Sequence, residues 1–180
     1  MMKPVWLPNT INLDGEWEKT LAKLFTIFEQ DFIKTECKFE ERLVQWDNRK
    51  LDRTYDEGFW HIISTTDQET LDRIPDFDRA KRLPWCAPTI CHSNDAQVKC
   101  WDYLESQGNI RTYVWLELWD YVVILQKRAI KSGEIAFLVT AYGVSGSSTR
   151  KKLARKYEQR VHPKHIRRPF GRRTISFYTW

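Results

Sequence analysis

Three apolar segments separated by short turn signals constrain the fold more than any other feature of this sequence. Residues 112–118 are rich in aromatic side chains, and residues 121–125 (YVVIL) and 136–144 (AFLVTAYGV) are rich in apolar and β-branched ones. A Trp-Asp pair fills the first gap, and the turn residues KSG precede the third segment. Strands joined by such short connections run antiparallel, so the sequence predicts an antiparallel sheet.

Helical patterns flank these strands. Residues 16–34 place apolar side chains at helical spacing, with Asp14 as the predicted N-cap. A second helix is predicted from Ser147 or Ser148 to about residue 160, and most of its polar positions are basic. The predicted fold class is α+β: a small antiparallel sheet of about four strands, a packed N-terminal helix and a basic C-terminal helix.

The segment between these features is less regular. FWHIIST at residues 59–65 is dense in aromatic and β-branched side chains, which favours a strand. A short helix is expected around residues 76–82, and residues 85–95 are expected to form a loop. Residues 39–46 fit no single pattern.

The size of the chain allows one sizeable core, because it has 180 residues. Residues 1–160 are therefore predicted to form a single domain, followed by a basic tail at residues 161–180. No apolar run approaches the ~20 residues of a membrane helix. Since the first residues also lack the apolar stretch of a secretory signal, a cytoplasmic location with no membrane partner is expected.

Positive charge is concentrated in the last third of the chain. Gln126 to Trp180 contain 14 Lys and Arg but two acidic residues, in a chain of net charge +5. Aromatic residues are interleaved with this charge, a combination that suits RNA or another polyanion. A solvated, disordered basic tail is the alternative interpretation.

His61 is the main candidate for proton transfer, because an unperturbed imidazole titrates near neutral pH. In the predicted strand it would share a face with Phe59 and Ile63. A structural histidine with its ring nitrogens paired is the competing interpretation. Thr140 and Tyr142 are two residues apart, so they are expected to face one side together with Leu138. There they could bind a phosphate or orient a ribose hydroxyl, and a solvated face of the sheet is the alternative interpretation.

Basic residues that would bind RNA fall into two groups. Arginine matches the geometry of phosphate with a planar fork, so the first group comprises dispersed cations in or beside the sheet. These are Arg79, Arg82, Lys99, Arg111, Lys127 and Arg128. The second group lies on the C-terminal helix and has no acidic neighbour in sequence before Glu158: Arg150, Lys151, Lys152, Arg155 and Lys156.

Metal and cofactor signatures are weak. Cys86, Cys91, His92 and Cys100 lack the spacing of a CxxC zinc knuckle, and without an export signal the cysteines are expected to be reduced thiols. Nucleotide-binding loops, metalloprotease and serine-hydrolase motifs are absent from the sequence, as is a paired carboxylate signature. Neither a cofactor nor a metal is expected, although a site involving these cysteines stays open.

Five ordered segments resemble one known group of proteins. They are EGFWHIIST, DRAKRLPW, VKCW, VWLELWDYVVILQKR and AFLVTAYGVSGSSTRKKLARKYEQR. From about residue 14 to residue 160 the sequence resembles a phage-associated branch of the BECR superfamily, which groups barnase-like, EndoU-like, colicin-type and RelE-like ribonucleases. The strand ending in T-A-Y and the basic helix after it are the most specific part.

The resemblance implies metal-independent RNA cleavage, in which a ribose 2′-hydroxyl attacks the adjacent phosphate. By position it makes His61 and Thr140 catalytic, assigns phosphate to Arg79 and Arg82, and gives Tyr142 a stacking or hydroxyl role. Lys99, Arg111 and Lys127 would support RNA binding. It also implies a toxin or phage-defence role with a neutralising antitoxin or immunity partner.

Two other functions stay open at this point: a non-catalytic RNA-binding module on the same scaffold, and an interaction protein whose tail binds an acidic partner. The three interpretations differ in whether His61, Thr140, Tyr142 and the arginines converge in one cleft. For catalysis, His61 and Thr140 are expected on one face of the sheet, within about 10 Å of a shared phosphate.

Overall fold

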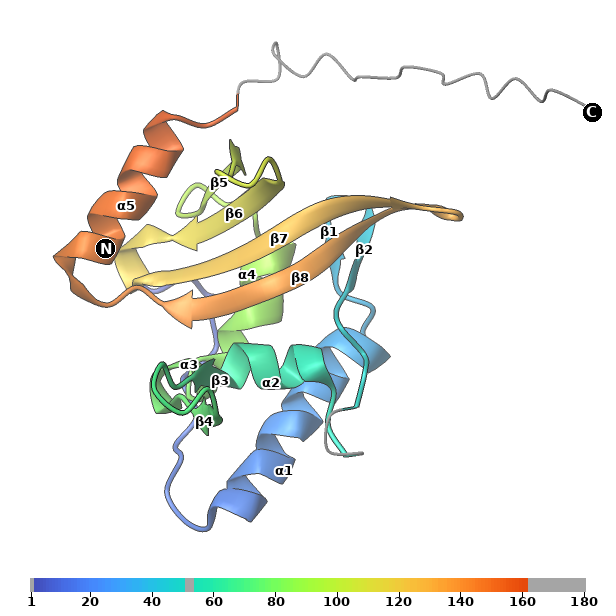
Figure 1. The fold of residues 1–180 in the computed structure, drawn as a ribbon, viewed down its shortest axis with the longest axis vertical. Helices are drawn as coiled ribbons and strands as arrows, with labels where there is room; N and C mark the ends of the chain where they lie inside the picture. The colour runs from blue at the N-terminus through green and yellow to red at the C-terminus, as the bar shows by residue number, and fades with distance from the viewer. Residues whose placement is uncertain (1, 51–53, 162–180) are drawn as a thin grey trace, which may run out of the picture.

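The fold is α+β, with a twisted six-stranded sheet, a separate two-stranded ribbon and five α-helices among residues 2–50 and 54–161, which the computed structural model describes (Figure 1). Strands of the large sheet lie in the order β1-β2-β8-β7-β6-β5. Their bounds are β1 (Lys38–Phe39), β2 (Arg42–Gln45), β5 (Lys99–Leu104), β6 (Ile110–Leu116), β7 (Tyr121–Ile130) and β8 (Gly133–Gly143).

The predicted succession of β6, β7 and β8 as antiparallel neighbours is confirmed. Between β6 and β7 the chain makes a 3₁₀ turn at Glu117–Trp119, and Asp120 then adopts a left-handed conformation with φ of 49°. Asp and Asn tolerate this conformation better than most residues, which explains the tight reversal.

Alternate residues of β7 pack into two apolar clusters on opposite faces of the sheet. Val123 and Leu125 join the larger cluster, formed with helices α1 (Trp17–Phe28), α2 (Glu57–Ile63) and α4 (Cys86–Cys91). Val122 and Ile124 join a smaller cluster that includes Leu153 of α5 (Gly146–Glu158). Since both faces are covered, β7 is apolar at successive positions.

The sheet is larger than the predicted four strands, and it is mixed. β2 pairs in parallel with the first half of β8, through Val44 opposite Ala136 and Gln45 opposite Phe137. β1 and β5 extend the two edges by antiparallel pairing. The prediction of a small, wholly antiparallel sheet is therefore not confirmed. The parallel pairing was not predicted because β2 and β8 are distant in sequence.

The N-terminal helical segment spans residues 17–34, close to the predicted residues 16–34, but its N-cap residue differs from the predicted one. α1 continues as a π-helical segment from Glu29 to Lys34, while Leu24 and Phe28 are fully buried. The prediction of Asp14 as N-cap is wrong, since Glu16 occupies that position without a side-chain cap. The Asp14 carboxylate instead accepts a hydrogen bond from the Asn12 side chain, at 2.7 Å.

Residues 57–63 form helix α2. The prediction of a strand at residues 59–65 is therefore wrong for residues 59–63, which include His61. Phe59, Ile62 and Ile63 are buried at helical spacing, which composition alone does not distinguish from a strand. Gly58 allows α2 to approach Trp46, because a Cβ at this position would lie 2.8 Å from the Trp46 side chain. The sheet therefore does not carry His61.

A short hairpin and three short helical segments follow α2. β3 (Ser64–Thr66) pairs with β4 (Arg73–Pro75), and α3 (Phe77–Ala80) confirms the short helix expected there. The prediction of a loop at residues 85–95 is wrong for residues 86–91, which form α4 and bury Cys86 and Ile90 on one face. Pro88 is compatible with α4 because it lies in the first turn, where an amide hydrogen bond is not required.

Helix α5 confirms the predicted basic helix, although its N-cap is Ser145 and not Ser147 or Ser148. Of the predicted tail at residues 161–180, the described part of the chain includes only Val161, so the possible strand in TISFYTW lies outside the described residues. Among the described helices, none has the length and apolar character needed to cross a membrane.

Candidate functional site

A groove runs along the outer edge of β8, beside α2, β3 and α3. β2 leaves β8 after Phe137, and α2 packs beside the remainder of the strand. The central pocket of the groove has a volume of about 320 Å³. Its lining residues are His61, Ser64, Thr65, Thr66, Arg73, Arg79, Val139 and Thr140. We call this region the β8 groove, and it includes two adjoining pockets that share His61 or Arg79 with the central one.

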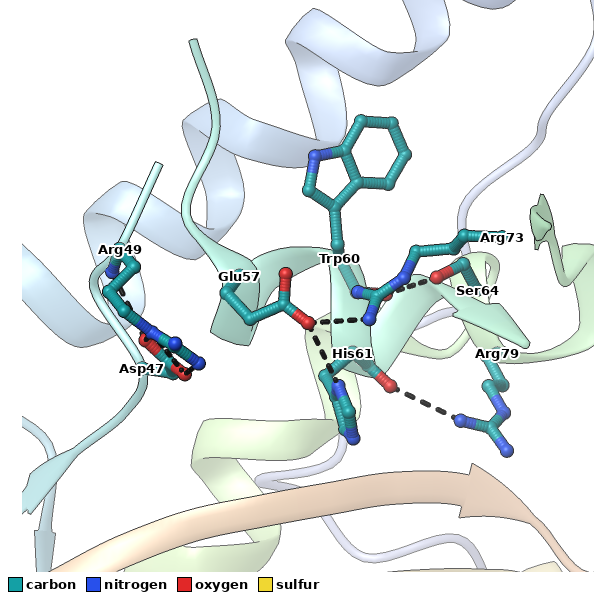
Figure 2. A network of polar contacts seen from close by, with 8 residues as sticks. All are labelled: Asp47, Arg49, Glu57, Trp60, His61, Ser64, Arg73 and Arg79. Atoms are coloured by element: carbon teal, nitrogen blue, oxygen red, sulfur yellow. Dashed lines mark hydrogen bonds and ion pairs between the residues drawn. The ribbon is translucent and has the colours of Figure 1, made fainter. Parts of the chain in front are cut away.

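The His61 side chain extends from α2 towards β8 (Figure 2). One turn earlier on the same helix, the Glu57 carboxylate lies 3.6 Å from His61 Nδ1 and 2.5 Å from Arg73 Nη2. The His61 side chain is 52% exposed, whereas the Glu57 side chain is 13% exposed. A largely buried carboxylate thus orients an accessible imidazole and an arginine at once.

Arg79 is held in the groove by the cap of α3. The Asp76 side chain accepts hydrogen bonds from the backbone N–H groups of Asp78 and Arg79, and it forms an ion pair with Arg79 Nε at 3.2 Å. Arg79 Nη1 donates to the His61 carbonyl oxygen at 3.2 Å (Figure 2). Because these contacts fix the guanidinium beside the pocket, Arg79 can meet an anion there with little loss of side-chain freedom.

Tyr142 lies in the next pocket along the groove, which Arg79 also lines. The Arg79 guanidinium carbon is 5.6 Å from the centre of the Tyr142 ring. Burial raises the pKa of Tyr142, with a smaller opposing effect from Arg79. Its phenol therefore stays protonated at neutral pH and can act as a hydrogen-bond donor.

A β-bulge determines which side chains of β8 enter the groove. Leu125 pairs with Leu138 and Ile124 pairs with Thr140, so Val139 is the extra residue between them. The bulge interrupts strand alternation, and Leu138 packs in the larger core cluster while Thr140 is only partly buried. The prediction that Leu138 shares a face with Thr140 and Tyr142 is therefore wrong.

Arg82 does not line the pocket that contains His61, although sequence analysis paired it with Arg79. It donates to the Asp78 carbonyl oxygen at 3.0 Å, forms an ion pair with the Asp78 carboxylate and lies 5.6 Å from the Trp85 ring centre. Gly143 makes room for this arrangement, since a Cβ there would lie 2.9 Å from Arg82 Nη1. Arg82 thus packs between α3 and Gly143 at the end of β8.

Two arginines converge at the other end of the groove. Arg111 Nη1 and Arg128 Nε both donate to Gln126 Oε1, at 2.6 and 3.0 Å. Arg111 and Arg128 line the pocket that also contains His61. Desolvation, with a smaller contribution from neighbouring Arg111, lowers the pKa of Arg128. Among the described residues, neither has a carboxylate ion-pair partner within 4.0 Å. Asp47 and Glu57 line the same pocket, and Asp47 opposes the lowering of the Arg128 pKa, so the two guanidinium groups face an anion together with nearby acids.

Two cations predicted in or beside the sheet, and two predicted on the C-terminal helix, are neutralised by acids from the sheet and its turns. Lys99 pairs with Glu117, Lys127 with Asp102 at 3.1 Å, and Arg150 with Asp120 at 2.6 Å. Lys156 pairs with Glu105 at 2.7 Å. The expectation that the basic helix lacks acidic partners is therefore wrong for its inward-facing residues, because the partners come from distant sequence.

Lys151, Lys152 and Arg155 are exposed on the outer side of α5, and none of them forms an ion pair with another residue in the part of the chain that the structure describes. They form a solvated basic surface, and the pocket at the N-terminal end of the helix is lined by Ser145 and Thr149 instead. The structure thus separates the predicted RNA-binding residues: Arg111 lies in the groove, whereas Lys99, Lys127 and the α5 residues lie outside its three pockets.

Sequence reasoning missed Glu57 and Arg73 as site residues. The spacing of Glu57 and His61 is i,i+4, which would have placed them on one face had residues 57–63 been recognised as helical. Arg73 enters through the β3–β4 hairpin, where it pairs with Thr66. That pairing follows a charged turn with no clear strand pattern, so no sequence signal located it.

The cysteine and histidine residues considered for a metal do not form a ligand group. All four cysteines are free thiols. Cys86 and Cys91 belong to α4, whereas Cys100 lies on β5. Within residues 2–50 and 54–161, no three His, Cys, Asp or Glu side chains are grouped in a way that could hold a metal ion.

Comparisons with protein-family models, with curated proteins and with solved structures found no match to this chain.

Proposed function

We propose that this protein is a metal-independent endoribonuclease of the toxin or phage-defence type, acting in the β8 groove. The observation that carries the proposal is the convergence of His61, Arg79 and Thr140 around one pocket, from the three elements α2, α3 and β8. A base, a fixed guanidinium and a hydroxyl are the groups that attack by a 2′-hydroxyl on a phosphate requires. The resemblance to BECR ribonucleases gives the same three residues functional roles.

In the proposed mechanism His61 is the general base. Since Nδ1 faces Glu57, Nε2 removes the proton from the 2′-hydroxyl, and the Glu57 carboxylate stabilises the imidazolium that results. Arg79 and Thr140 bind the phosphate oxygens, and Arg73 adds positive charge as negative charge develops on them.

Tyr142 is assigned as the proton donor to the departing 5′-oxygen, because its phenol lies beside Arg79 in the pocket that adjoins the central one. The bond from the 2′-oxygen to phosphorus forms as the bond to the 5′-oxygen breaks. The proton from the 2′-hydroxyl goes to His61, and the proton from Tyr142 goes to the leaving group. The products are a 2′,3′-cyclic phosphate and a 5′-hydroxyl end.

A non-catalytic RNA-binding module is the second candidate function. The specific observation that favours it is the Arg111–Arg128 pair, which can bind phosphate without any chemistry at His61. This candidate predicts RNA binding in the β8 groove with no cleavage by the native protein.

The test is incubation of purified protein with single-stranded RNA in excess chelator, followed by identification of the product ends. We expect cyclic phosphate ends and a loss of about 10²- to 10⁴-fold in rate for His61→Ala. His92→Ala is the matched control, because His92 is exposed, stacks on Trp6 with a centroid distance of 4.6 Å and caps α4. Equal activity in the two variants would reject the assignment of His61. Binding without cleavage by the native protein would favour the RNA-binding module.

A further inference from the structure

A pair of cysteines lies outside the β8 groove, where β1 begins and α4 ends. The sulfur atoms of Cys37 and Cys91 are 3.6 Å apart, although 54 positions separate them in sequence. Cys37 is buried and Cys91 is exposed. A disulfide requires an S–S distance of about 2.05 Å, so a small movement of two side chains would allow the bond to form.

The two thiols are not equivalent. The hydrogen bond between the two sulfur atoms lowers the pKa of Cys91 to about 6 against the opposing effect of desolvation, helped by the Lys38 backbone N–H and by His92. The same interaction raises the pKa of Cys37, and burial adds to that effect. Cys91 is consequently a thiolate at neutral pH while Cys37 keeps its proton, which is the division between an attacking and a resolving cysteine.

We propose that Cys37 and Cys91 form a peroxide-reactive dithiol, with Cys91 as the nucleophile and Cys37 as the resolving thiol. The inference stands on a sulfur–sulfur distance of 3.6 Å between an exposed residue, Cys91, and a buried one, Cys37. It is independent of the ribonuclease proposal, because neither cysteine lines the β8 groove.

The oxidant is hydrogen peroxide or an organic hydroperoxide. The Cys91 thiolate attacks one peroxide oxygen and the O–O bond breaks, which gives a sulfenic acid and a hydroxide or alkoxide that is protonated to water or the alcohol. Cys37 then loses its proton, and its sulfur attacks the Cys91 sulfur as the S–O bond breaks and a water leaves. Two thiols lose two electrons, and one hydrogen peroxide yields two waters.

Oxidation of Cys91 also prepares the second step. The hydrogen bond to Cys91 is the largest cause of the raised pKa of Cys37. Once Cys91 is a sulfenic acid, its sulfur no longer carries the negative charge, so Cys37 can release its proton more readily. The resulting disulfide would join the start of β1 to the end of α4.

The experiment treats reduced, folded protein with hydrogen peroxide and follows each cysteine by alkylation and peptide mass spectrometry. We expect a Cys37–Cys91 disulfide within one molecule and a mass decrease of about 2 Da. Cys100 is the internal control, since desolvation raises its pKa to about 12. Cys91 should therefore react at least about tenfold faster than Cys100 at pH 7.

Two variants separate the roles of the cysteines. Cys91→Ser should prevent the disulfide, whereas Cys37→Ser should leave a sulfenic acid on Cys91 that a dimedone probe captures. If the Cys37 variant does not fold, the pH dependence of alkylation of the native protein decides: the Cys91 rate should level off above about pH 7 while that of Cys100 still rises. Equal oxidation of Cys91 and Cys100, or pairing of Cys91 with Cys86 or another molecule, would overturn the proposal.

Discussion

The β8 groove and the outer surface of α5 are both basic, but their charges are held differently. In the groove, Arg111 and Arg128 share a neutral acceptor and line a pocket next to His61. The groove also holds Arg73 and Arg79, each of which has a carboxylate partner but still lines the central pocket. On α5, Arg150 and Lys156 are tied to acidic residues of the sheet region, and the remaining cations face solvent. The number of Lys and Arg in a segment therefore does not measure the positive charge available to a ligand, because acids from distant parts of the sequence can neutralise it.

The largest expected effect is a difference in cleavage rate between variants of two arginines, Arg79 and Arg82, that are three positions apart. Arg79 lines the central pocket, whereas Arg82 pairs with Asp78 of α3 and packs beside Gly143 of β8. Arg79→Gln should lower the cleavage rate by about 10²- to 10³-fold, as expected when one donor to a developing negative charge is removed. Arg82→Gln should instead lower the free energy of unfolding by about 1–3 kcal/mol and leave the rate per folded molecule nearly unchanged.

Cleavage rates and urea denaturation of both variants check this prediction. If the Arg82 variant remains stable but loses as much activity as the Arg79 variant, the placement of Arg82 outside the catalytic site is wrong.

A comparison of two double variants tests which basic region binds RNA. Arg111→Gln with Arg128→Gln removes the groove pair, and Lys151→Gln with Lys152→Gln removes the same charge from exposed α5 positions. The groove variant should bind 2′-O-methyl RNA at least about tenfold more weakly, since each charge-assisted hydrogen bond contributes ~1.5 kcal/mol or more. The slope of log affinity against log salt concentration should become shallower by about 0.7 for each RNA phosphate that the variant no longer neutralises.

The α5 variant should change affinity less, because its side chains are solvated and line none of the groove pockets. Fluorescence anisotropy at several salt concentrations measures both quantities. A larger loss of affinity in the α5 variant would reverse the comparison and restore the basic helix as the main RNA-binding surface.

The smallest expected effect concerns stability on α5. Arg150 contacts Asp120 at 2.6 Å and the Glu117 carbonyl oxygen at 2.8 Å, but its side chain is 41% exposed. Arg150→Gln should therefore lower the free energy of unfolding by less than about 1 kcal/mol. Arg155→Gln, which removes an exposed charge with no recorded ion pair, should have no measurable effect by thermal or urea denaturation. Equal decreases in stability for both variants would contradict the distinction between paired and solvated cations.

The sequence predicted the parts of the fold that depend on local patterns. β6, β7 and β8 are adjacent in sequence and joined by short turns, so their pairing followed from apolar runs and turn residues. α1 was found because its buried positions repeat at helical spacing. The parallel pairing of β2 with β8 was not found, because a short edge strand has little pattern and its partner is distant.

For the candidate site, the sequence predicted several of the residues correctly but not the elements that position them. His61 and Thr140 line the same pocket, but His61 arrives there on a helix and Thr140 through a bulge. Aromatic and β-branched composition favours a strand at residues 59–65, but Phe59, Ile62 and Ile63 are buried in the core at helical spacing. Neutralisation of Lys156 by Glu105 was likewise invisible, because 51 positions separate them in sequence.

The most direct measurement of where RNA lies is photo-crosslinking with a 2′-O-methyl oligonucleotide that contains 4-thiouridine, followed by peptide mass spectrometry. This probe binds without being cleaved, so it reports position independently of catalysis. If the β8 groove is the RNA site, crosslinks should fall in α2, β3 and the second half of β8, which carry His61, Thr65 and Tyr142. Crosslinks confined to β5 and α5 would contradict the account.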